Sequence, residues 1–353
     1  MSAKTPAVIL GGTGYVAGEL LRLTLAHPRL ELAAIASDSQ PGEPVANAFP
    51  HLAAACGNLR YVSIADAGDV VARKPRAAVL AAAPHGVSGA LIDSILRKAE
   101  AAGANPAVVD ISADYRYADL AEYERVYRHA HAAPARAKQF TCAVPEHLDR
   151  SPTPHVAHPG CFATATLLAT VPLLALGLAD GPVFVSAVTG STGAGRSPIA
   201  GTHHPQRHSD LYSYNALTHR HAAEIRALAR AASGRDFQLA FVPHSGPFAR
   251  GIHATVQAKL AKPLDSQGAI EALRRFYAGK PFVRVLDDPP RVKDVVASNY
   301  AHLSAAANGD TIVVMSVVDN LVKGAAGGAM QWMNRQLGFA ETEGLTAPAP
   351  GWT

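Results

Sequence analysis

The sequence predicts an α/β protein with a doubly wound parallel sheet, followed by a second, α+β domain built on a mixed sheet. In the first 150 residues or so, short apolar runs alternate with longer helical patterns, as in βαβ units. Beyond about residue 160, strand-like runs recur with fewer helices between them, which is typical of a mixed sheet. The 353 residues are enough for about two domains.

The first half of the chain supplies the parallel sheet. A helical, leucine-rich pattern follows the first apolar run and ends at His27-Pro28, and a second helix over residues 91–102 ends at Gly103. A connection rich in proline and histidine over residues 145–159 is the expected boundary, so the first domain is predicted over residues 1–157. The predicted strands are residues 7–10, 32–36, 77–82 and 107–111.

The second half is predicted as a domain over residues 158–320. Its expected helices are residues 164–176, 219–232 and 267–277, and its expected strands are residues 183–188, 237–242, 252–260, 282–285 and 311–318. The segment 321–353 carries a glycine- and alanine-rich helix at 323–337, which is expected to return to the first domain.

Composition excludes several classes of function. The net charge is only +4 and basic residues form no run, so nucleic acid is not an expected partner. Residues 1–10 lack the apolar h-region of a signal peptide, and the sequence contains no apolar span of ~20 residues, so no membrane association is expected. Its three cysteines, Cys56, Cys142 and Cys161, show no close spacing that would suggest a disulfide framework or a zinc ribbon. A reducing cytoplasm is the expected location.

A glycine-rich loop, GGTGYVAG at residues 11–18, follows the first strand and opens a helix. Small residues let the backbone approach a pyrophosphate, and the helix N-terminus supplies N–H donors. The second strand ends at Ser37-Asp38-Ser39. There Asp38 suits the ribose hydroxyls of NAD, whereas the hydroxyls of Ser37 and Ser39 suit the 2′-phosphate of NADP. The residues alone leave that choice open.

Cys161 is the candidate nucleophile. Pro159-Gly160 forces a turn before it and an apolar helical pattern follows it. A cysteine at a helix N-terminus is stabilised as the reactive thiolate, although a buried structural thiol is the alternative interpretation.

His219 and His221 are candidate partners for this thiol, as a base or as a proton donor to an oxyanion. On a helix, residues two apart diverge by ~200°, so at most one of them is expected to meet Cys161. Nearby histidines lack the acidic or cysteine ligand that would complete a tetrahedral metal site, and no metal is expected.

Two further stretches suit anions. The segment 190–196, GSTGAGR, combines glycine amides with Ser191 and Arg196, which favour phosphate or carboxylate. Pro243-His244 with Arg250-Gly251 offers a second cationic site.

These features together resemble the N-acetyl-gamma-glutamyl-phosphate reductases, an arginine-pathway branch of the semialdehyde dehydrogenase group. The resemblance extends from Gly11 to about Thr346. It rests on GGTGY at 11–15, APHG at 83–86, DISADYR at 110–116, PGCFAT at 159–164, GAGR at 193–196, HRH at 219–221, PH at 243–244, RG at 250–251, SN at 298–299 and DNLVKGAAG at 319–327.

The resemblance implies a Rossmann domain, a catalytic domain on a mixed sheet, NADP(H) as cofactor and a homo-oligomer, a dimer or tetramer. The expected reaction is the NADPH-dependent reduction of N-acetyl-gamma-glutamyl phosphate to its semialdehyde, through a thioester on Cys161 and with His219 as acid/base. The expected substrate ligands are Ser191, Arg196, His221 and Arg250, and the expected cofactor ligands are Gly11, Thr13, Gly14, Tyr15, Val16, Ser37, Ser39, Pro84 and Asn320.

The chain also departs from the family pattern. Many members have Asn and Tyr where this chain has His158 and Phe162, and an arginine where it has Asp38. The open alternatives are a reductase of aminoadipyl phosphate, whose substrate is carried on an acidic carrier protein, and an aspartate-semialdehyde-type dehydrogenase. A cysteine hydrolase would need no dinucleotide, and a nucleotide-sensing module would need no reactive thiol.

Overall fold

The computed structural model describes residues 3–351, which form two compact units. The first unit comprises the chain up to Ala143 together with Arg150–His158 and Ala326–Thr346. The second comprises Val144–Asp149, Pro159–Ala325 and the chain from Ala347. Each unit is therefore assembled from segments far apart in the sequence. None of the described helices is long and apolar enough to cross a membrane.

Within the described residues, the first unit contains a six-stranded sheet in which every pairing is parallel. In spatial order the strands are β2 (Leu30–Ala36), β1 (Thr5–Leu10), β3 (Ala78–Ala81), β4 (Ala107–Asp110), β6 (His155–Ala157) and β5 (Phe140–Cys142). Because β1 pairs with both β2 and β3, the strand order reverses beside β1, where parallel sheets of this kind bind ligands. The predicted doubly wound sheet is confirmed.

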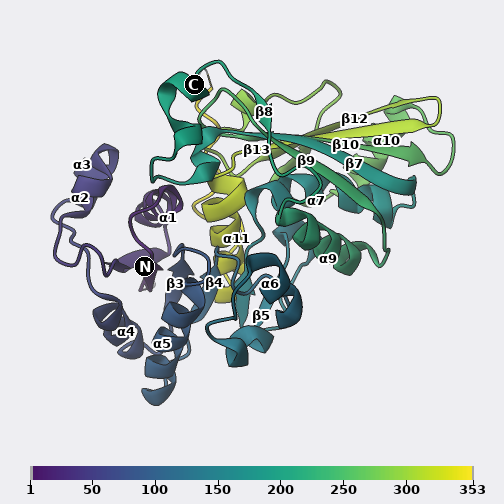
Figure 1. The fold of residues 1–353 in the computed structure, drawn as a ribbon. Helices are drawn as coiled ribbons and strands as arrows, with labels where there is room; N and C mark the ends of the chain where they lie inside the picture. Colours follow the sequence, from purple (N-terminus) through teal and green to yellow (C-terminus); the bar gives the residue numbers. More distant parts are fainter. Residues whose placement is uncertain (1–2, 352–353) are drawn as a thin grey trace. The chain divides into compact units, whose positions relative to one another are not determined.

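Helices cover this sheet through alternating apolar side chains. Val8 and Leu10 pack with α4 (Ile64–Ala72) and α5 (Ser88–Ala101), whereas Ala7 and Ile9 are equally buried, as in a strand covered on both faces. Helix α1 (Tyr15–Leu25) contacts α11 (Gly327–Leu337), which also contacts β3 and β4 (Figure 1). The remaining helices of this unit are α2 (Val45–Ala48), α3 (Ala53–Cys56) and α6 (Leu120–Tyr127).

The second unit contains a seven-stranded mixed sheet within the described residues, as predicted. In spatial order its strands are β11 (Val283–Val285), β12 (Ala301–Asn308), β13 (Thr311–Val318), β10 (Ile252–Leu260), β7 (Ala179–Thr189), β9 (Leu239–Ser245) and β8 (Tyr212–Ser213). Helices α7 (Cys161–Ala175), α9 (His221–Ser233) and α10 (Ser266–Phe276) share one apolar core with it, and α8 (His204–Arg207) is short.

Strands β7 and β10 of the second sheet bury every other side chain along most of their length. In β7, Val183, Val185 and Ala187 are buried, whereas Phe184 and Ser186 between them are exposed, Phe184 by 52%. Such alternation places one face of a sheet on the core and leaves the other exposed. An exposed phenylalanine on that second face is suited to covering by another chain.

Several of the predicted helices differ from those observed, among them α5, which begins three residues before the expected start. Helix α7 begins at Cys161, three residues before the expected start. The expected helix over 323–337 is instead a π-helical turn, η7 (Val322–Ala326), followed by α11. Helix α4 was missed because glycine at position 68 weakens its helical pattern; a Cβ there would meet the Lys98 side chain of α5 at 2.7 Å. Strands of two or three residues, such as β5 and β8, are too short to show a period.

Candidate active site

Cys161 is the first residue of α7, which packs against β7, β10, β13 and α9. Gly160 enters the helix in an extended conformation, and its backbone N–H donates to Oε1 of the buried Glu224 at 2.6 Å. The first turn contains only uncharged residues, and the thiol is half-buried. The first-turn N–H groups and the positive end of the helix dipole therefore favour the thiolate form of Cys161, as the sequence predicted.

The π-helical turn η7 packs directly on this cysteine. A Cβ on Gly324 would lie 2.8 Å from Cys161 Cβ, so only glycine permits the approach. The neighbouring Lys323 is fully buried, and its Nζ lies 2.6 Å from Oε1 of the equally buried Glu146. This buried ion pair holds the turn in place. π-Helical turns often mark functional sites.

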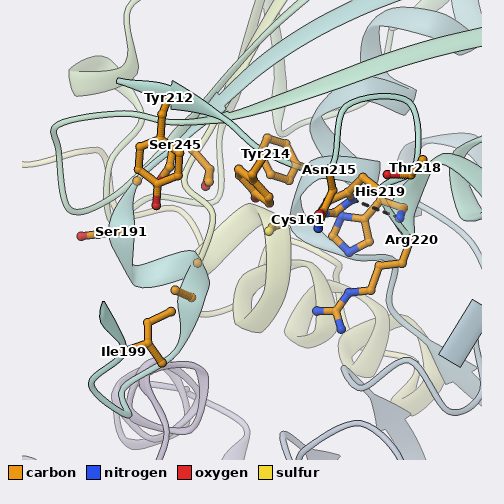
Figure 2. A pocket seen from close by; sticks show the side chains of 16 residues that line it. Cys161, Ser191, Ile199, Tyr212, Tyr214, Asn215, Thr218, His219, Arg220 and Ser245 are labelled. Atoms are coloured by element: carbon orange, nitrogen blue, oxygen red, sulfur yellow. Dashed lines mark hydrogen bonds between the residues drawn. The ribbon is translucent and has the colours of Figure 1, made fainter. Parts of the chain in front are cut away.

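A cavity of about 630 Å³ in the second unit contains Cys161. Figure 2 shows Ser191 and His219 on opposite sides of the sulfur in this view. Four predicted site residues line the cavity together: Cys161, Ser191, His219 and His221. The full lining is Cys161, Phe162, Thr189, Gly190, Ser191, Gly193, Ala194, Ile199, Tyr212, Tyr214, Asn215, Thr218, His219, Arg220, His221 and Ser245. Arg196 is exposed and lies outside this lining. Arg250 lines a separate cavity of about 250 Å³.

The expectation that at most one histidine faces Cys161 rested on a wrong premise. Helix α9 begins at His221, so His219 precedes it and the helical divergence does not apply. Both rings line the cavity, with their centroids 4.8 Å apart. The backbone N–H of His221 donates to Nδ1 of His219 at 3.2 Å, which orients the His219 ring (Figure 2).

The protonation of His219 follows from these contacts. Burial, and then the positive charge of Arg220, lower the pKa of His219 to about 4, so the ring is neutral near pH 7. Because Nδ1 accepts a hydrogen bond, the proton of the neutral ring resides on Nε2. His219 therefore acts as a hydrogen-bond donor. Burial and the neighbouring Cys161 raise the pKa of Tyr214, whose hydroxyl stays protonated and provides a second donor in the cavity.

The Ser191 loop is held by the segment around Ala249. The N–H groups of Ser191 and Thr192 donate to the carbonyls of Phe248 and Ala249, at 2.9 and 3.0 Å. A Cβ on Gly190 would lie 2.4 Å from the Ala249 oxygen, so this approach also requires glycine. The result is a rigid backbone wall that places Ser191 in the cavity.

Asn320 and Asp319, in the DNLVKGAAG run, support the same wall. The Asn320 amide accepts from the N–H of Gly251 at 2.7 Å and donates to the Thr192 hydroxyl at 3.0 Å. The buried Asp319 carboxylate accepts two hydrogen bonds from the Arg250 guanidinium, both at 3.0 Å. These contacts assign Asn320 and Arg250 a structural part; their contacts with cofactor and substrate stay predictions.

Several cavity residues had escaped the sequence analysis. Tyr212 and Tyr214 reach the cavity because β8 pairs with the end of β9, and Ser245 lies on that end. Ile199, Asn215 and Thr218 come from the polar, histidine-rich stretch between strands. Only the nearness of His219 and His221 in the sequence pointed toward this stretch. Among residues 3–351, no group of three or more His, Cys, Asp or Glu side chains is placed to hold a metal ion.

The glycine-rich loop of the first unit fits a dinucleotide pyrophosphate. Gly11 has a φ of +78°, and a Cβ there would lie 2.5 Å from the backbone of Ala83. At Gly14, which precedes α1, a Cβ would meet no other atom of the described residues within 4 Å. No described side chain caps α1 either, so its first N–H groups stay available to an anion. Thr13, Tyr15 and Val16 flank this open space, and the Tyr61 hydroxyl donates to the Gly12 carbonyl at 2.9 Å.

At the end of β2, the residue expected to favour NAD and the two expected to favour NADP have different partners. Oδ1 of Asp38 accepts from the backbone N–H of Ile64 at 2.8 Å, so its carboxylate caps the start of α4. The hydroxyls of Ser37 and Ser39 lie 3.1 Å apart. Asp38 therefore has a structural partner, while the two hydroxyls form a pair suited to a phosphate. Pro84 follows β3 at the same edge of the sheet and is exposed.

Two protein-family models match this chain, one in each half of the sequence. The model described as "Semialdehyde dehydrogenase, NAD binding domain" matches residues 6–153, and that described as "Semialdehyde dehydrogenase, dimerisation domain" matches residues 161–320. A protein of Pseudomonas aeruginosa named N-acetyl-gamma-glutamyl-phosphate reductase is 39% identical, with 97% of this chain and 98% of that protein covered. One of the same name from Desulforudis audaxviator is 36% identical, with 96% and 97% covered.

The chain belongs to the N-acetyl-gamma-glutamyl-phosphate reductase family of semialdehyde dehydrogenases. Solved structures show the same fold at low identity. Aspartate semialdehyde dehydrogenase II of Vibrio cholerae, complexed with ASA, has a TM-score of 0.68 at 16% identity, covering 95% of this chain and 98% of that chain. The aspartate semialdehyde dehydrogenase of Candida albicans with NADP has a TM-score of 0.63 at 16% identity, covering 96% and 99%. The resemblance drawn from the motifs is confirmed.

Proposed function

We propose that this member of the N-acetyl-gamma-glutamyl-phosphate reductase family reduces N-acetyl-gamma-glutamyl phosphate to its 5-semialdehyde with NADPH, as a step of arginine biosynthesis. The observation that carries the proposal is Cys161 at the start of α7, in one cavity with the Nε2–H donor of His219. Relatives of that name at 39% identity over nearly the full chain support the substrate. A thiol nucleophile needs a reducing compartment, so the cytoplasm is the proposed location.

The first step forms an acyl-enzyme. The Cys161 thiolate attacks the acyl carbon, a C–S bond forms, and the C–O bond to phosphate breaks. Ser191 and His221 line the cavity and are proposed to bind the substrate's anionic groups, by hydroxyl and imidazole donors. Arg196 and Arg250 stay predicted anion ligands. The leaving phosphate takes one proton from solvent, and the thioester holds the carbonyl inside the cavity.

The second step develops a negative charge that His219 can stabilise. The hydride that reduces the thioester is the chemistry a bound nicotinamide supplies. As the carbonyl carbon is reduced, its oxygen becomes an oxyanion, to which Nε2–H of His219 donates. Collapse of this oxyanion breaks the C–S bond, yields the aldehyde and restores the thiolate. Starting from a thiolate, the cycle needs no base at the sulfur.

NADP is the proposed cofactor. The open N-terminus of α1 suits the pyrophosphate, through Gly11, Thr13, Gly14, Tyr15 and Val16. The paired hydroxyls of Ser37 and Ser39 suit a 2′-phosphate, while the Asp38 carboxylate caps α4 and so has a role besides binding ribose. Pro84 and Asn320 stay predicted cofactor ligands.

The reverse reaction tests the function. The wild-type protein is expected to reduce NADP, faster than NAD, when N-acetylglutamate semialdehyde and phosphate are both present. Cys161→Ser should abolish this turnover and leave NADPH binding intact, because serine is not ionised near pH 7. Cys142→Ser is the matched control and should keep activity. Appreciable turnover by Cys161→Ser would exclude the covalent scheme.

Parallel assays separate the alternative substrates. Preference for the aminoadipate homologue over N-acetylglutamate semialdehyde would replace the proposal with an aminoadipyl-phosphate reductase. Preference for aspartate semialdehyde would replace it with an aspartate-semialdehyde-type dehydrogenase. Turnover without any dinucleotide would indicate a hydrolase. A Cys161 no more reactive toward iodoacetamide than buried Cys56, whose pKa burial raises, would indicate a sensing module.

We also propose that the chain forms a homo-oligomer, a dimer or tetramer, through the exposed face of the second sheet. The matched dimerisation-domain model and the exposed Phe184 on β7 support this interface. Phe184→Glu is expected to lower the molar mass measured by light scattering, because a charge there resists burial. An unchanged mass would exclude this face as the interface.

A further inference from the structure

The DISADYR segment after β4 contains two buried carboxylates that the proposed reaction does not use. Asp110 is fully buried and Asp114 is 1% exposed. Buried carboxylates are retained only with hydrogen-bonding or charged partners. Their partners therefore indicate what the segment does.

Asp114 binds the loop and helix that follow β3. Its Oδ1 accepts from the N–H of Gly86 at 2.7 Å, and its Oδ2 from the N–H of Gly89 at 2.8 Å. The hydroxyl of Tyr123 also donates to Oδ1, at 3.2 Å. Because Gly86 and Gly89 flank the first residue of α5, the carboxylate occupies the N-terminus of that helix. The start of α5 is therefore filled from within the protein, whereas that of α1 is open.

Neighbouring contacts tie the same loop, residues 82–88, to the DISADYR segment. The hydroxyl of Ser88 donates to Oδ1 of Asp110 at 2.8 Å. The N–H of Ala113 donates to Nδ1 of His85 at 2.9 Å. The far end of the loop is therefore held at His85, at Ser88 and, through Asp114, at the backbone amides of Gly86 and Gly89.

The near end of loop 82–88 forms a wall of the glycine-rich loop. The N–H of Ala82 donates to the Leu10 carbonyl at 2.9 Å. The backbone of Ala83 lies so close to Gly11 that a Cβ on Gly11 would come within 2.5 Å of the Ala83 Cα. Loop 82–88 therefore runs from the strand-order reversal beside β1 to Asp114. Asp114 thus holds one end of the loop whose other end contacts the glycine-rich loop.

We propose that Asp114 is a positioning residue for dinucleotide binding: by holding the amides of Gly86 and Gly89 it fixes loop 82–88 beside the glycine-rich loop. The inference rests on the proposed function only in taking NADPH as the dinucleotide. Asp114 touches neither substrate nor reacting atoms in this scheme. Its effect is on cofactor affinity, and not on the chemistry at Cys161.

Asp114→Asn tests the proposal. The amide has the same shape, but its NH₂ group faces an N–H donor, so one of the two backbone anchors is lost. The Kd for NADPH, measured by fluorescence titration, is expected to rise at least about tenfold. The KM for NADPH should rise in parallel, while kcat at saturating NADPH and the KM for semialdehyde change less than about threefold. A general loss of folded protein would instead lower kcat and leave the KM unchanged.

Three further variants complete the series. Gly86→Ala leaves Asp114 intact but strains the loop, because Gly86 has a φ of +82°, and should also weaken NADPH binding. Tyr123→Phe removes only the third hydrogen bond and should have a smaller effect. Asp119→Asn is the matched control: Asp119 caps α6, so the same change in the same unit should leave the Kd unaltered.

The outcomes are distinct. If Asp114→Asn and Gly86→Ala both bind NADPH within twofold of the wild type, the positioning role is excluded. If Asp114→Asn does not fold, Gly86→Ala and Tyr123→Phe decide by the same measurement. If the wild type itself binds neither NADPH nor NADH, the proposed function fails, and not the role of Asp114 alone.

Discussion

The protonation state of His219 determines which role this residue can take in the second step of the proposed reaction. A ring with Nδ1 occupied by a backbone N–H and a pKa of about 4 is neutral, with its proton on Nε2. Such a ring donates a hydrogen bond but has no lone pair at Nε2 to accept the thiol proton. The thiolate of Cys161 is instead favoured by the start of α7. Among the roles open to His219 from sequence, the geometry favours the oxyanion donor.

A glutamine in place of His219 tests this role. The glutamine amide carries an N–H donor at about the position of Nε2, so His219→Gln should keep kcat within about tenfold of the wild type. His219→Ala removes the donor and should lower kcat by about 10²–10³-fold. Steady-state kinetics at saturating substrates measures both. Equal losses in the two variants would show that proton transfer, which glutamine cannot perform, is required.

At the scale of single elements, α7 contains a proline that its surroundings accommodate. Pro172 has no N–H, so the Leu168 carbonyl lacks its helical donor. The Tyr277 hydroxyl, at the end of α10, donates to that carbonyl at 2.6 Å and lies 3.0 Å from Nε2 of His147. Burial lowers the pKa of His147 to about 4, and its neutral Nε2–H donates to the tyrosine oxygen. The helix that begins with Cys161 is therefore tied to α10.

A double-mutant cycle tests this connection. Tyr277→Phe leaves a buried carbonyl and an imidazole N–H without this partner and should lower the free energy of unfolding by about 1–3 kcal/mol. Pro172→Ala restores an N–H to the helix, so the double variant should lose less than Tyr277→Phe alone. Urea unfolding measures all four proteins. Strict additivity would show that the tyrosine does not substitute for the missing helical donor.

At the scale of the whole molecule, buried titratable groups determine the response to acid. Burial lowers the pKa of His147, His155 and His219 to about 4, below the ordinary 6.5. The unfolded chain then binds these protons first, so stability is lost as the pH falls from about 6.5 to 4. Asp110 acts oppositely: burial raises its pKa to about 6, so its contribution is present at low pH and lost as the pH rises through 6. Three histidines outweigh one aspartate.

The protein is therefore expected to be less stable at pH 5 than at pH 7.5, by about 1–2 kcal/mol for each such histidine. Urea midpoints at the two pH values measure the difference. His155→Gln removes one of these groups and should reduce the difference between the two midpoints, whatever its effect at pH 7.5. A larger difference in this variant, or greater wild-type stability at pH 5, would contradict the assignment.

The sequence alone identified the features that depend on neighbouring residues. Apolar runs alternating with helices predict a parallel sheet, and a glycine-rich turn between strand and helix predicts an anion site. Cys161 was predicted at a helix start because Pro159-Gly160 favours a turn and an apolar helical pattern follows it. The signal for each element lies within about ten residues, where backbone sterics and hydrophobic periodicity dominate, although the strands of the sheet pair across much longer separations.

The tertiary structure decided the contacts between distant segments. Asp319 pairs with Arg250, 69 residues away, and Asn320 reaches Thr192 across 128 residues. Whether His219 and His221 share a cavity depended on where α9 begins, which no helical period reveals. Local patterns carry no information on such pairings, because hydrogen bonds and burial between remote residues exist only once the chain has folded. The partners of Asp38 and Asp114 became visible for the same reason.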